Sequence, residues 1–342
     1  MQITTIGFDV AKLVFQVHGA DRDGRPLVRK QLKRKDVRNY FAKLPPCLVG
    51  IEACASAHYW ARELQSFGHD VRLIPPQFVK PYVKSNKNDA ADAEAICEAV
   101  GRANMRFVPI KNPSSQALLG LHRVREAFVK HRTAQSNQIR GLLGEFGIVV
   151  PRGMGKLFES LPRILDDSAN GLPDLMRQLL VRLRDHLRLL DEQVGELDRQ
   201  IQLCHRQDER SRRQAAIPGI GPITATALAA SVSDARAFKN GRQMAAWLGL
   251  VPRQNSTGGK TVLLGISKRG DTYLRTLLIQ GAHSVVTRAT HKDPWVERLC
   301  ARRSANVASV ALANKNARIA WALLAHGRTY EGPSVTRTSV PA

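Results

Sequence analysis

The order of strand-forming and helix-forming segments in residues 1–105 is the feature that most restricts the fold of this chain. Three β-branched, apolar segments come first, and helices then alternate with two further strands. Strands that alternate with helices indicate a sheet with a parallel part. Gly and Pro residues mark several of the boundaries between segments. The strands are expected at 3–7, 13–18, 27–32, 47–51 and 71–74, and the helices at 37–44, 58–67 and 78–83, with one more that carries Asp89 and Asp92.

Four acidic residues stand at the ends of these predicted elements. Asp9 follows the first strand, Glu52 ends the fourth, and Asp89 and Asp92 lie on the last helix. Residues three apart share one face of a helix, so the last two carboxylates can converge. A three-strand meander followed by this alternation is the order of the ribonuclease H-like fold, in which acidic residues occupy these places. We therefore predict an α/β N-terminal domain of this fold over residues 1–105.

Four carboxylates in a cationic protein favour a divalent-metal site that acts on phosphodiesters. Two Mg²⁺ ions about 4 Å apart can clamp the attacking and leaving oxygens, and such hard cations take oxygen ligands. Without metal, the mutual repulsion of the carboxylates raises their pKa values. The alternative is that these acidic residues are caps, turn residues or part of a solvated helix face. Glu94 and Glu98, on the same helix, fit that second interpretation.

The composition favours nucleic acid as the partner. The chain has 52 Lys and Arg against 29 Asp and Glu, a formal charge of +23, and clustered cations gain affinity for phosphates through counterion release. No stretch is long and apolar enough to cross a bilayer, and no signal peptide precedes the first strand. The five cysteines are scattered without a CxxC pair, which argues against a zinc site or a disulfide framework. We expect a cytoplasmic protein with no membrane partner.

Residues 106–210 are expected to form a long helical and coiled-coil connector. One helix is predicted from 114 to 146, and its Arg123, Lys130 and Arg140 can contact phosphates without reading sequence. An ordinary solvated face is the alternative. A second helix carries apolar residues at spacings of four and three, the pattern of a heptad seam. A coiled coil within or between chains, or an intramolecular helical hairpin, would bury this seam, which consists of Leu183, Leu187, Leu190, Val194, Leu197, Ile201 and Cys204.

Residues 211–330 are expected to form a mostly helical C-terminal domain. Gly219 and Gly221 precede a helix and resemble a helix-hairpin-helix motif, whose backbone N–H groups would face a phosphate. A tight turn between helices is the alternative. Further on, Ser256 lies in a glycine-flanked loop among cations, which makes it a candidate nucleophile for phosphorus, because the cations stabilise the developing charge. A turn serine without a catalytic role is the alternative. The cations are Arg253, Lys260, Lys268, Arg269 and Arg275.

Six motifs in order make the chain resemble the DEDD-type transposases of bacterial insertion sequences. The motifs are IGFDVAK, GIEACASAHYWARELQ, VKSNKNDAADAEAI, IPGIGPITATALAA, WLGLVPRQNSTGGK and ISKRGDTYLRTLL. That family pairs an N-terminal RuvC-like domain, which has the ribonuclease H-like fold, with a C-terminal transposase domain that bears a serine. It includes the bridge-RNA-guided recombinases. The motifs lie at both ends of the chain, and the middle matches only in its helical character.

The resemblance implies a role for each of the five candidate residues. Asp9, Glu52, Asp89 and Asp92 would bind Mg²⁺ at a two-ion site, and Ser256 would form a covalent phosphoserine link to DNA. It also implies donor and target DNA as substrates, an element-encoded structured RNA as guide, and homodimers that join into a tetramer. In that arrangement the acidic residues of one subunit face the serine of another. The protein would be nucleoid-associated in a bacterial cytoplasm.

Two other functions fit part of the sequence. A RuvC-like metal nuclease of the junction-resolvase type would use the acidic residues alone and would not rejoin DNA, but it leaves the Ser256 loop unexplained. A non-catalytic nucleic-acid-binding protein would need neither centre, and the complete acidic set speaks against it. Residues 331–342 are rich in Ser, Thr and Pro and are expected to form a disordered tail.

Overall fold

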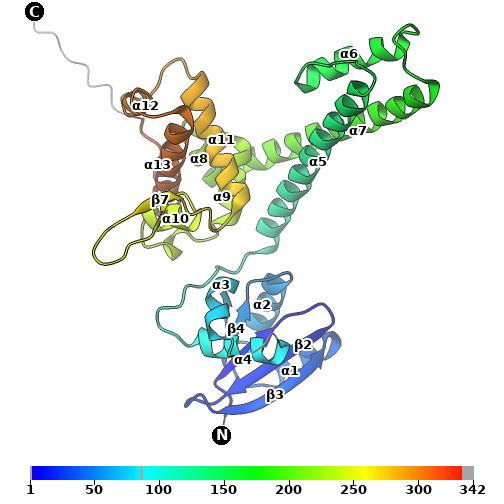
Figure 1. Ribbon diagram of the computed structural model, residues 1–342. Coiled ribbons are helices and arrows are strands. Elements are labelled where there is room, and N and C mark those ends of the chain that lie inside the picture. Colours follow the sequence, from blue (N-terminus) through cyan, green and yellow to red (C-terminus); the bar gives the residue numbers. More distant parts are fainter. Residues whose placement is uncertain (1, 85–87, 333–342) are drawn as a thin grey trace, which may run out of the picture. The chain divides into compact units, whose positions relative to one another are not determined.

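The computed structural model describes residues 2–84 and 88–332, and the chain divides into two compact units, residues 1–113 and 114–342. Figure 1 shows the first unit in blue and cyan and the second in green to red. Each unit has its own hydrophobic core, as separately packed domains do. The tail predicted at 331–342 lies outside the described residues from position 333 on.

A five-stranded mixed sheet in the order β3-β2-β1-β4-β5 forms the centre of the first unit. β1 (Thr5–Asp9), β2 (Val14–Ala20) and β3 (Pro26–Lys33) make an antiparallel meander. β4 (Leu48–Glu52) and β5 (Asp70–Ile74) continue the sheet parallel to β1. The predicted strand order and the partly parallel sheet are therefore confirmed. Because β1 and β4 are parallel neighbours, their C-terminal ends meet at one edge.

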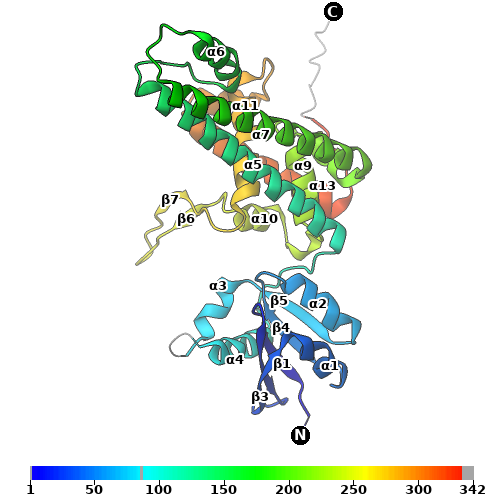
Figure 2. The ribbon, with the colours of Figure 1, turned by 90° about the vertical axis from the view of Figure 1, so that its right-hand side faces the viewer.

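Helices cover both faces of this sheet (Figure 2). α4 (Asp89–Val100) packs on one face, against β1, β2 and β4, while α1 (Val37–Ala42) and α2 (Ala57–Ser66) cover the other. Aromatic rings fill the second face, where Phe8 and Trp60 meet edge to face with their centroids 6.3 Å apart. Both faces are thus apolar and covered, as parallel strands require.

Glycines in the strands let α4 lie close to the sheet. A Cβ at Gly7 would stand 1.9 Å from the carbonyl oxygen of Ala93 and 2.5 Å from the amide nitrogen of Cys97. At Gly50 on β4, a Cβ would come within 2.8 Å of the Val100 Cβ. No larger residue fits at Gly7 unless α4 shifts. These two positions therefore set the height of α4, and with it the place of the acidic residues at its start.

The segment before α4 differs from the prediction. Instead of one helix at 78–83, the structure has α3 (Pro76–Val79) followed by a 3₁₀ turn at Lys80–Tyr82. Pro81 has no N–H to continue the α-helical hydrogen bonds, so the chain tightens there. Another 3₁₀ turn, Arg34–Asp36, leads into α1.

The second unit begins with two long helices, α5 (Pro113–Gly144) and α7 (Asp174–Gln207), which are connected through α6 (Met154–Asp166) (Figures 1 and 2). Polar pairs between α5 and α7 follow the two helices in opposite directions, so the pair is antiparallel. The single long helix predicted at 114–146 is confirmed. The seam of α7 is buried within this unit at Leu187, Leu190, Val194 and Ile201. The chain thus forms the intramolecular hairpin, and pairing between chains stays a prediction.

The remainder of the second unit is mostly helical, as predicted, and includes one short β-hairpin. α11 (Thr272–Arg288) and α13 (Ala305–His326) pack along each other, and α10 (Gly241–Trp247) packs on α13, around a core of mainly aliphatic residues. The hairpin consists of β6 (Pro252–Gln254) and β7 (Leu263–Ile266). The helices are α8 (Glu209–Ala215), α9 (Pro222–Ser231), α10 (Gly241–Trp247), α11 (Thr272–Arg288), α12 (Pro294–Cys300) and α13 (Ala305–His326), with a 3₁₀ turn at Ala235–Ala237.

Candidate active site

Two parallel strands and one helix carry the four predicted carboxylates toward one edge of the first unit's sheet. Asp9 is the last residue of β1, and Glu52 is the last residue of its parallel neighbour β4. Asp89 and Asp92 form the acidic first turn of α4. That helix starts where it does because the Oδ1 of Asn88 accepts the N–H of the second helical residue at 3.0 Å.

The four carboxylates form one electrostatic site. The pKa of Asp9 is raised from 3.8 to about 6, first by burial and then by the negative charges of Asp92, Asp89 and Glu52. A carboxylate raises the pKa of another only when the two are close. This confirms, for Asp9, the raised pKa expected of such a cluster without metal.

The donor chemistry of this cluster fits a hard cation. All four groups offer carboxylate oxygens, the ligands that Mg²⁺ prefers. In the described part of the chain, however, no three His, Cys, Asp or Glu side chains lie close enough together to hold one ion. The carboxylates affect the titration of Asp9 without enclosing a coordination site. Because like charges repel, a bound cation would draw them closer than they lie in this structure.

Two neighbouring glutamates on α4 have other partners. Lys84 Nζ lies 3.2 Å from a carboxylate oxygen of Glu94 and 3.5 Å from one of Glu98. Arg29 also pairs with Glu94, and Arg102 with Glu98. These are surface ion pairs, in agreement with the solvated role predicted for both residues.

Ser256 lies on a β-hairpin arm, residues 249–270, which we call the serine arm and which protrudes from the C-terminal helices (Figure 1). The N–H of Asn255 donates to the carbonyl oxygen of Val262 at 2.9 Å and extends the pairing of β6 and β7. Gly258 and Gly259 form the tip with φ of +54° and +78°. Two consecutive positive φ angles suit a two-residue hairpin turn and favour glycine. The glycines of this motif therefore place Ser256 near an exposed hairpin tip.

The Ser256 hydroxyl is exposed and accepts a hydrogen bond from Gln254, whose Nε2 lies 2.9 Å from Oγ. Since the amide is the donor, the hydroxyl hydrogen remains available for transfer to a base. Arg253 and Lys260 are exposed on the same arm. Gln254 is not among the candidate residues predicted from the sequence, although residues two apart on an extended strand share a face. That spacing was the available signal.

Arg275 ties the two ends of the serine arm together. Its guanidinium donates to the carbonyl oxygens of Leu248 at 3.1 Å and Arg269 at 2.9 Å, and to the hydroxyl of Thr272 at 3.0 Å. Gly249 permits this closure, since a Cβ there would lie 2.2 Å from the Arg269 carbonyl oxygen. Arg275 is buried, so the prediction that it contacts phosphates is wrong: its donors are used inside the domain.

Comparison with known proteins shows what this arrangement belongs to. A model described as the transposase IS116/IS110/IS902 family matches residues 211–299, and a DEDD transposase model of the IS110 type matches residues 6–148. A probable family 20 transposase of Pseudomonas aeruginosa is 56% identical over 335 residues, which is 96% of this chain and 99% of the relative. The chain belongs to the IS110/IS116/IS902 transposase family.

Two further relatives are named for insertion sequences. The transposase for IS1111A of Coxiella burnetii is 45% identical over 332 residues, with 96% of this chain and 91% of the relative covered. The transposase for IS1328 of Yersinia enterocolitica is 43% identical over 332 residues, with 96% and 98% covered. The chain is thus an insertion-sequence transposase, and the class acts on DNA by cutting and joining it. None of the described helices is both long and apolar enough to cross a membrane.

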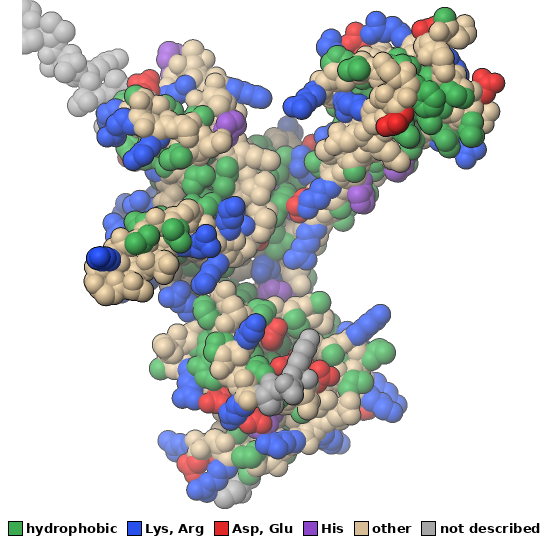
Figure 3. Space-filling model, viewed as in Figure 1, with side chains coloured by type: hydrophobic (Ala, Val, Ile, Leu, Met, Phe, Trp, Pro, Cys, Tyr) green, Lys and Arg blue, Asp and Glu red, His purple; other side chains and the backbone are tan. Residues whose placement is uncertain are grey.

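Basic side chains are widely distributed on the transposase. Figure 3 shows Lys and Arg over both units, in agreement with the formal charge of +23. On α5, Arg123 and Lys130 are exposed, and Lys130 pairs with Glu126 at 2.6 Å. Arg140 instead donates to the carbonyl oxygens of Ser136 at 3.2 Å and Gly153 at 2.7 Å. These bonds hold the turn before α6, and contact between the partly exposed Arg140 and a phosphate stays a prediction.

The Gly-x-Gly turn lies between α8 and α9, which pack together. Gly219 has a φ of +88°, and a Cβ there would stand 2.8 Å from the carbonyl oxygen of Gly281 on α11. Packing against α11 thus explains this glycine, in accord with the tight-turn alternative. Gly221 is exposed at the start of α9, and contact between its backbone and a phosphate stays a prediction, as does the helix-hairpin-helix role of the turn.

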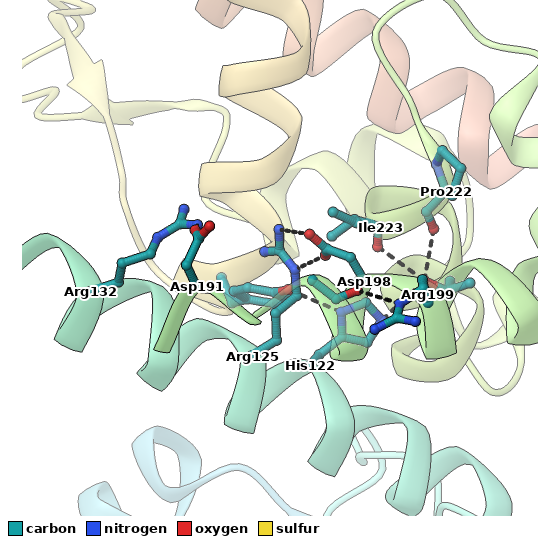
Figure 4. A network of polar contacts seen from close by, with 11 residues as sticks. His122, Arg125, Arg132, Asp191, Asp198, Arg199, Pro222 and Ile223 are labelled. Carbon is teal, nitrogen blue, oxygen red and sulfur yellow. Dashed lines mark hydrogen bonds and ion pairs between the residues drawn. The ribbon is translucent and has the colours of Figure 1, made fainter. Parts of the chain in front are cut away.

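A polar network that the sequence did not reveal joins α5 to α7 in the transposase (Figure 4). Arg125 forms an ion pair with Asp198, and Arg132 forms one with Asp191. All four side chains lie where the two long helices face each other. In the sequence these residues are ordinary charged positions of two amphipathic helices. Only the antiparallel packing of the helices shows which arginine forms an ion pair with which aspartate.

His122 extends this network from α5 to α9 and α11 (Figure 4). Its Nδ1 lies 3.0 Å from the Tyr273 hydroxyl, and its Nε2 lies 3.0 Å from the Thr226 hydroxyl. Thr226 donates its own hydrogen to the Pro222 carbonyl oxygen at 2.7 Å, so Nε2 carries the proton and Nδ1 accepts from Tyr273. Burial, with the charge of Arg125 beside it, lowers the pKa of His122 to about 4. The network therefore holds a neutral imidazole at the N-terminal end of α11, which directly follows the serine arm.

Proposed function

We propose that this transposase cuts and rejoins DNA through a phosphoserine link at Ser256, together with a metal-binding set of Asp9, Glu52, Asp89 and Asp92. The observation that carries the proposal is the presence of two reactive centres in one family member. One is a group of mutually repelling carboxylates in the first unit. The other is an exposed hydroxyl at the tip of a rigidly anchored arm in the second.

In the first unit, the carboxylates would hold the ions and orient the DNA backbone. Two Mg²⁺ ions, when bound, would stabilise the charge on the attacking and leaving oxygens of the phosphodiester. The order of strands and helices supports a ribonuclease H-like (RuvC-like) assignment for this domain. Asp9, the partly buried last residue of β1, is the carboxylate whose pKa the charges of the other three raise.

In the second unit, the Ser256 oxygen would attack the phosphorus atom of the scissile phosphodiester. An Oγ–P bond forms, the bond from phosphorus to one deoxyribose oxygen breaks, the serine proton passes to a base, and the leaving oxygen gains a proton. Gln254 donates to Oγ and would stabilise its developing negative charge, with Arg253 and Lys260 close by on the arm. Attack by a hydroxyl of another strand would reverse the step and rejoin the DNA.

The wider assembly follows the family resemblance. We propose an element-encoded guide RNA that pairs with donor and target DNA, and homodimers that join into a tetramer in which one subunit's acidic set faces another's serine. Exposed cations would position the nucleic acid in a nucleoid-associated protein: Arg123, Lys130, Arg253, Lys260, Lys268 and Arg269. We divide the chain into the catalytic domain at 1–105, the connector at 106–210, the serine-bearing domain at 211–330 and the tail at 331–342.

A strand-exchange assay separates this function from the alternatives. Donor and target DNA, the element's RNA and Mg²⁺ are incubated with wild type, Ser256→Ala, Asp89→Ala and the neighbouring-hydroxyl control Thr257→Ala. We expect Ser256→Ala and Asp89→Ala to lose recombinant product by about a thousandfold or more, and Thr257→Ala to retain it. Cleavage by Ser256→Ala at the wild-type rate would refute the serine mechanism and indicate a metal nuclease of the resolvase type. Binding without cleavage by wild type and every variant would indicate a non-catalytic binding protein.

A further inference from the structure

A polar cavity of about 810 Å³ lies in the second unit, at the C-terminal end of α13. It is bounded by the start of α8, by the segment that follows α9, and by the last residues of α13. We call it the arginine pocket. The side chains that bear on its chemistry are Arg210, Ser233, Asp234, Arg236, His326 and Arg328.

The pocket is electropositive. Three arginines, Arg210, Arg236 and Arg328, line the cavity together with one acidic residue, Asp234. Asp234 Oδ1 accepts the backbone N–H of Arg236 at 2.8 Å and thereby caps the 3₁₀ turn. Within the described ranges, none of the three guanidinium groups forms an ion pair with a carboxylate, whereas many other surface arginines do. Arginine stays charged at every physiological pH, so the pocket carries uncompensated positive charge.

One buried hydroxyl in the pocket lacks a partner. Ser233 Oγ is shielded from solvent and forms no hydrogen bond with any described residue. A buried hydroxyl without a hydrogen bond destabilises a protein, and native structures contain few of them. Ser233 lines the same cavity as the three arginines. Its hydroxyl is thus an unused hydrogen-bond donor on a residue that lines the pocket.

We propose that the arginine pocket binds a backbone phosphate of nucleic acid. Guanidinium groups match the geometry of phosphate oxygens with paired N–H donors, and a serine hydroxyl adds a further donor. Such a contact positions the nucleic acid without reading its sequence. Arg210 is partly fixed for this role, since its Nη2 also donates to the Val232 carbonyl oxygen. The site is separate from the proposed serine chemistry and does not depend on it.

The test measures binding, not catalysis, so its outcome is independent of the proposed serine reaction. A short labelled DNA duplex is titrated with the full-length protein over a range of salt concentrations, and binding is followed by fluorescence anisotropy. The variant Arg236→Gln/Arg328→Gln removes two charges from the pocket. The matched control Arg302→Gln/Arg303→Gln removes two charges from exposed positions outside it. We expect the pocket variant to bind about tenfold more weakly, with a salt dependence reduced by about two counterions, and the control to change about twofold.

Ser233→Ala gives a second readout that a purely structural role would not produce. Removal of a buried hydroxyl that has no partner should raise the melting temperature of the free protein. The same change should weaken duplex binding about threefold, because the phosphate loses a donor. A lower melting temperature with unchanged binding would show that the hydroxyl has an internal structural role and would overturn its assignment.

Inorganic phosphate distinguishes a nucleic-acid contact from a site for a free anion. In thermal-shift measurements it should stabilise wild type more than the pocket variant, and the duplex should compete with it. Stabilisation by inorganic phosphate with equal duplex affinity in all variants would indicate a small-anion site and overturn the proposal. Equal losses of duplex affinity in the pocket variant and the control would show a general charge effect and overturn it as well.

Discussion

Replacement of Asp9 by Asn should make the metal-free first unit more stable, even though it removes a proposed metal ligand. The pKa of Asp9 in the folded protein is raised from 3.8 to about 6, by burial and by three neighbouring carboxylates. The folded state therefore binds this proton more tightly than the unfolded chain does. The stability that the proton contributes is fully present below the unfolded pKa and is lost as the pH rises through about 6. The amide side chain of the Asp9→Asn variant carries no charge, so the variant does not lose stability as the pH rises through this value.

The size of the effect follows from the shift. A change from 3.8 to about 6 corresponds to about 3 kcal/mol at 1.36 kcal/mol per pKa unit. Asp9 is only partly buried, so solvent screens much of the repulsion, and we expect about 1 kcal/mol. For a domain of this size that is a rise in melting temperature of roughly 4 °C.

Thermal unfolding in EDTA at about pH 5 and about pH 8 measures the difference, since these values lie on either side of the shifted pKa. Asp36→Asn, at an exposed carboxylate before α1, is the matched control and should leave the melting temperature unchanged. Addition of Mg²⁺ should stabilise wild type more than Asp9→Asn. A lower melting temperature for Asp9→Asn than for wild type at the higher pH would refute the reasoning, as would an equal gain for Asp36→Asn.

Three further predictions concern packing and titration. Because the pKa of His122 is lowered from 6.5 to about 4, the second unit should lose stability as the pH falls through that window, by up to about 3 kcal/mol. Urea unfolding of wild type and His122→Gln measures this, and equal pH dependence of the two would contradict it. Arg275→Lys keeps the positive charge but loses the branched guanidinium group that reaches both ends of the serine arm. Proteolysis within the arm should therefore rise several-fold, and strand exchange should fall. Guanidinium ion added to Arg275→Ala should restore part of the strand exchange, and an unchanged proteolysis pattern would argue against the anchoring role. Gly7→Ala places a Cβ 1.9 Å from the Ala93 carbonyl oxygen and should lower the unfolding free energy of the first unit by about 2 kcal/mol or more; a urea-unfolding change within about 0.5 kcal/mol would show that α4 shifts freely.

The fold of the first unit was predictable because its signals are local. Apolar, β-branched segments and their Gly and Pro boundaries are read within a few residues. The parallel pairing of β1 with β4 follows from the helix between them, and it alone brings Asp9 and Glu52 to one edge. The closeness of α4 depends on Gly7 and Gly50, whose role becomes visible only when the helix lies over the sheet.

The sequence could not show which basic residues are free to contact nucleic acid and which hold the fold together. Arg253, Arg140 and Arg275 have the same chemistry, but the first is exposed and the other two donate to backbone carbonyl groups. Those carbonyls belong to turns that many sequences could form, so no side-chain pattern predicts the contacts. Likewise, the heptad spacing predicted that α7 buries an apolar seam. It could not predict that α5 is the partner helix, which becomes clear only from contacts such as the ion pair between Arg125 and Asp198.

The central claim is a covalent bond between Ser256 and DNA, and mapping of the adduct tests it most directly. Protein, guide RNA, Mg²⁺ and labelled DNA are incubated, the reaction is denatured, and the linked peptide is identified by trypsin digestion and mass spectrometry. Cleavage after Arg253 and Lys260 would release the peptide 254–260, which contains both Ser256 and Thr257. We predict a nucleotide phosphoester on Ser256 that is absent from Ser256→Ala and from Asp89→Ala. Cleaved DNA without any linked peptide, or a link at Thr257 or elsewhere, would contradict it.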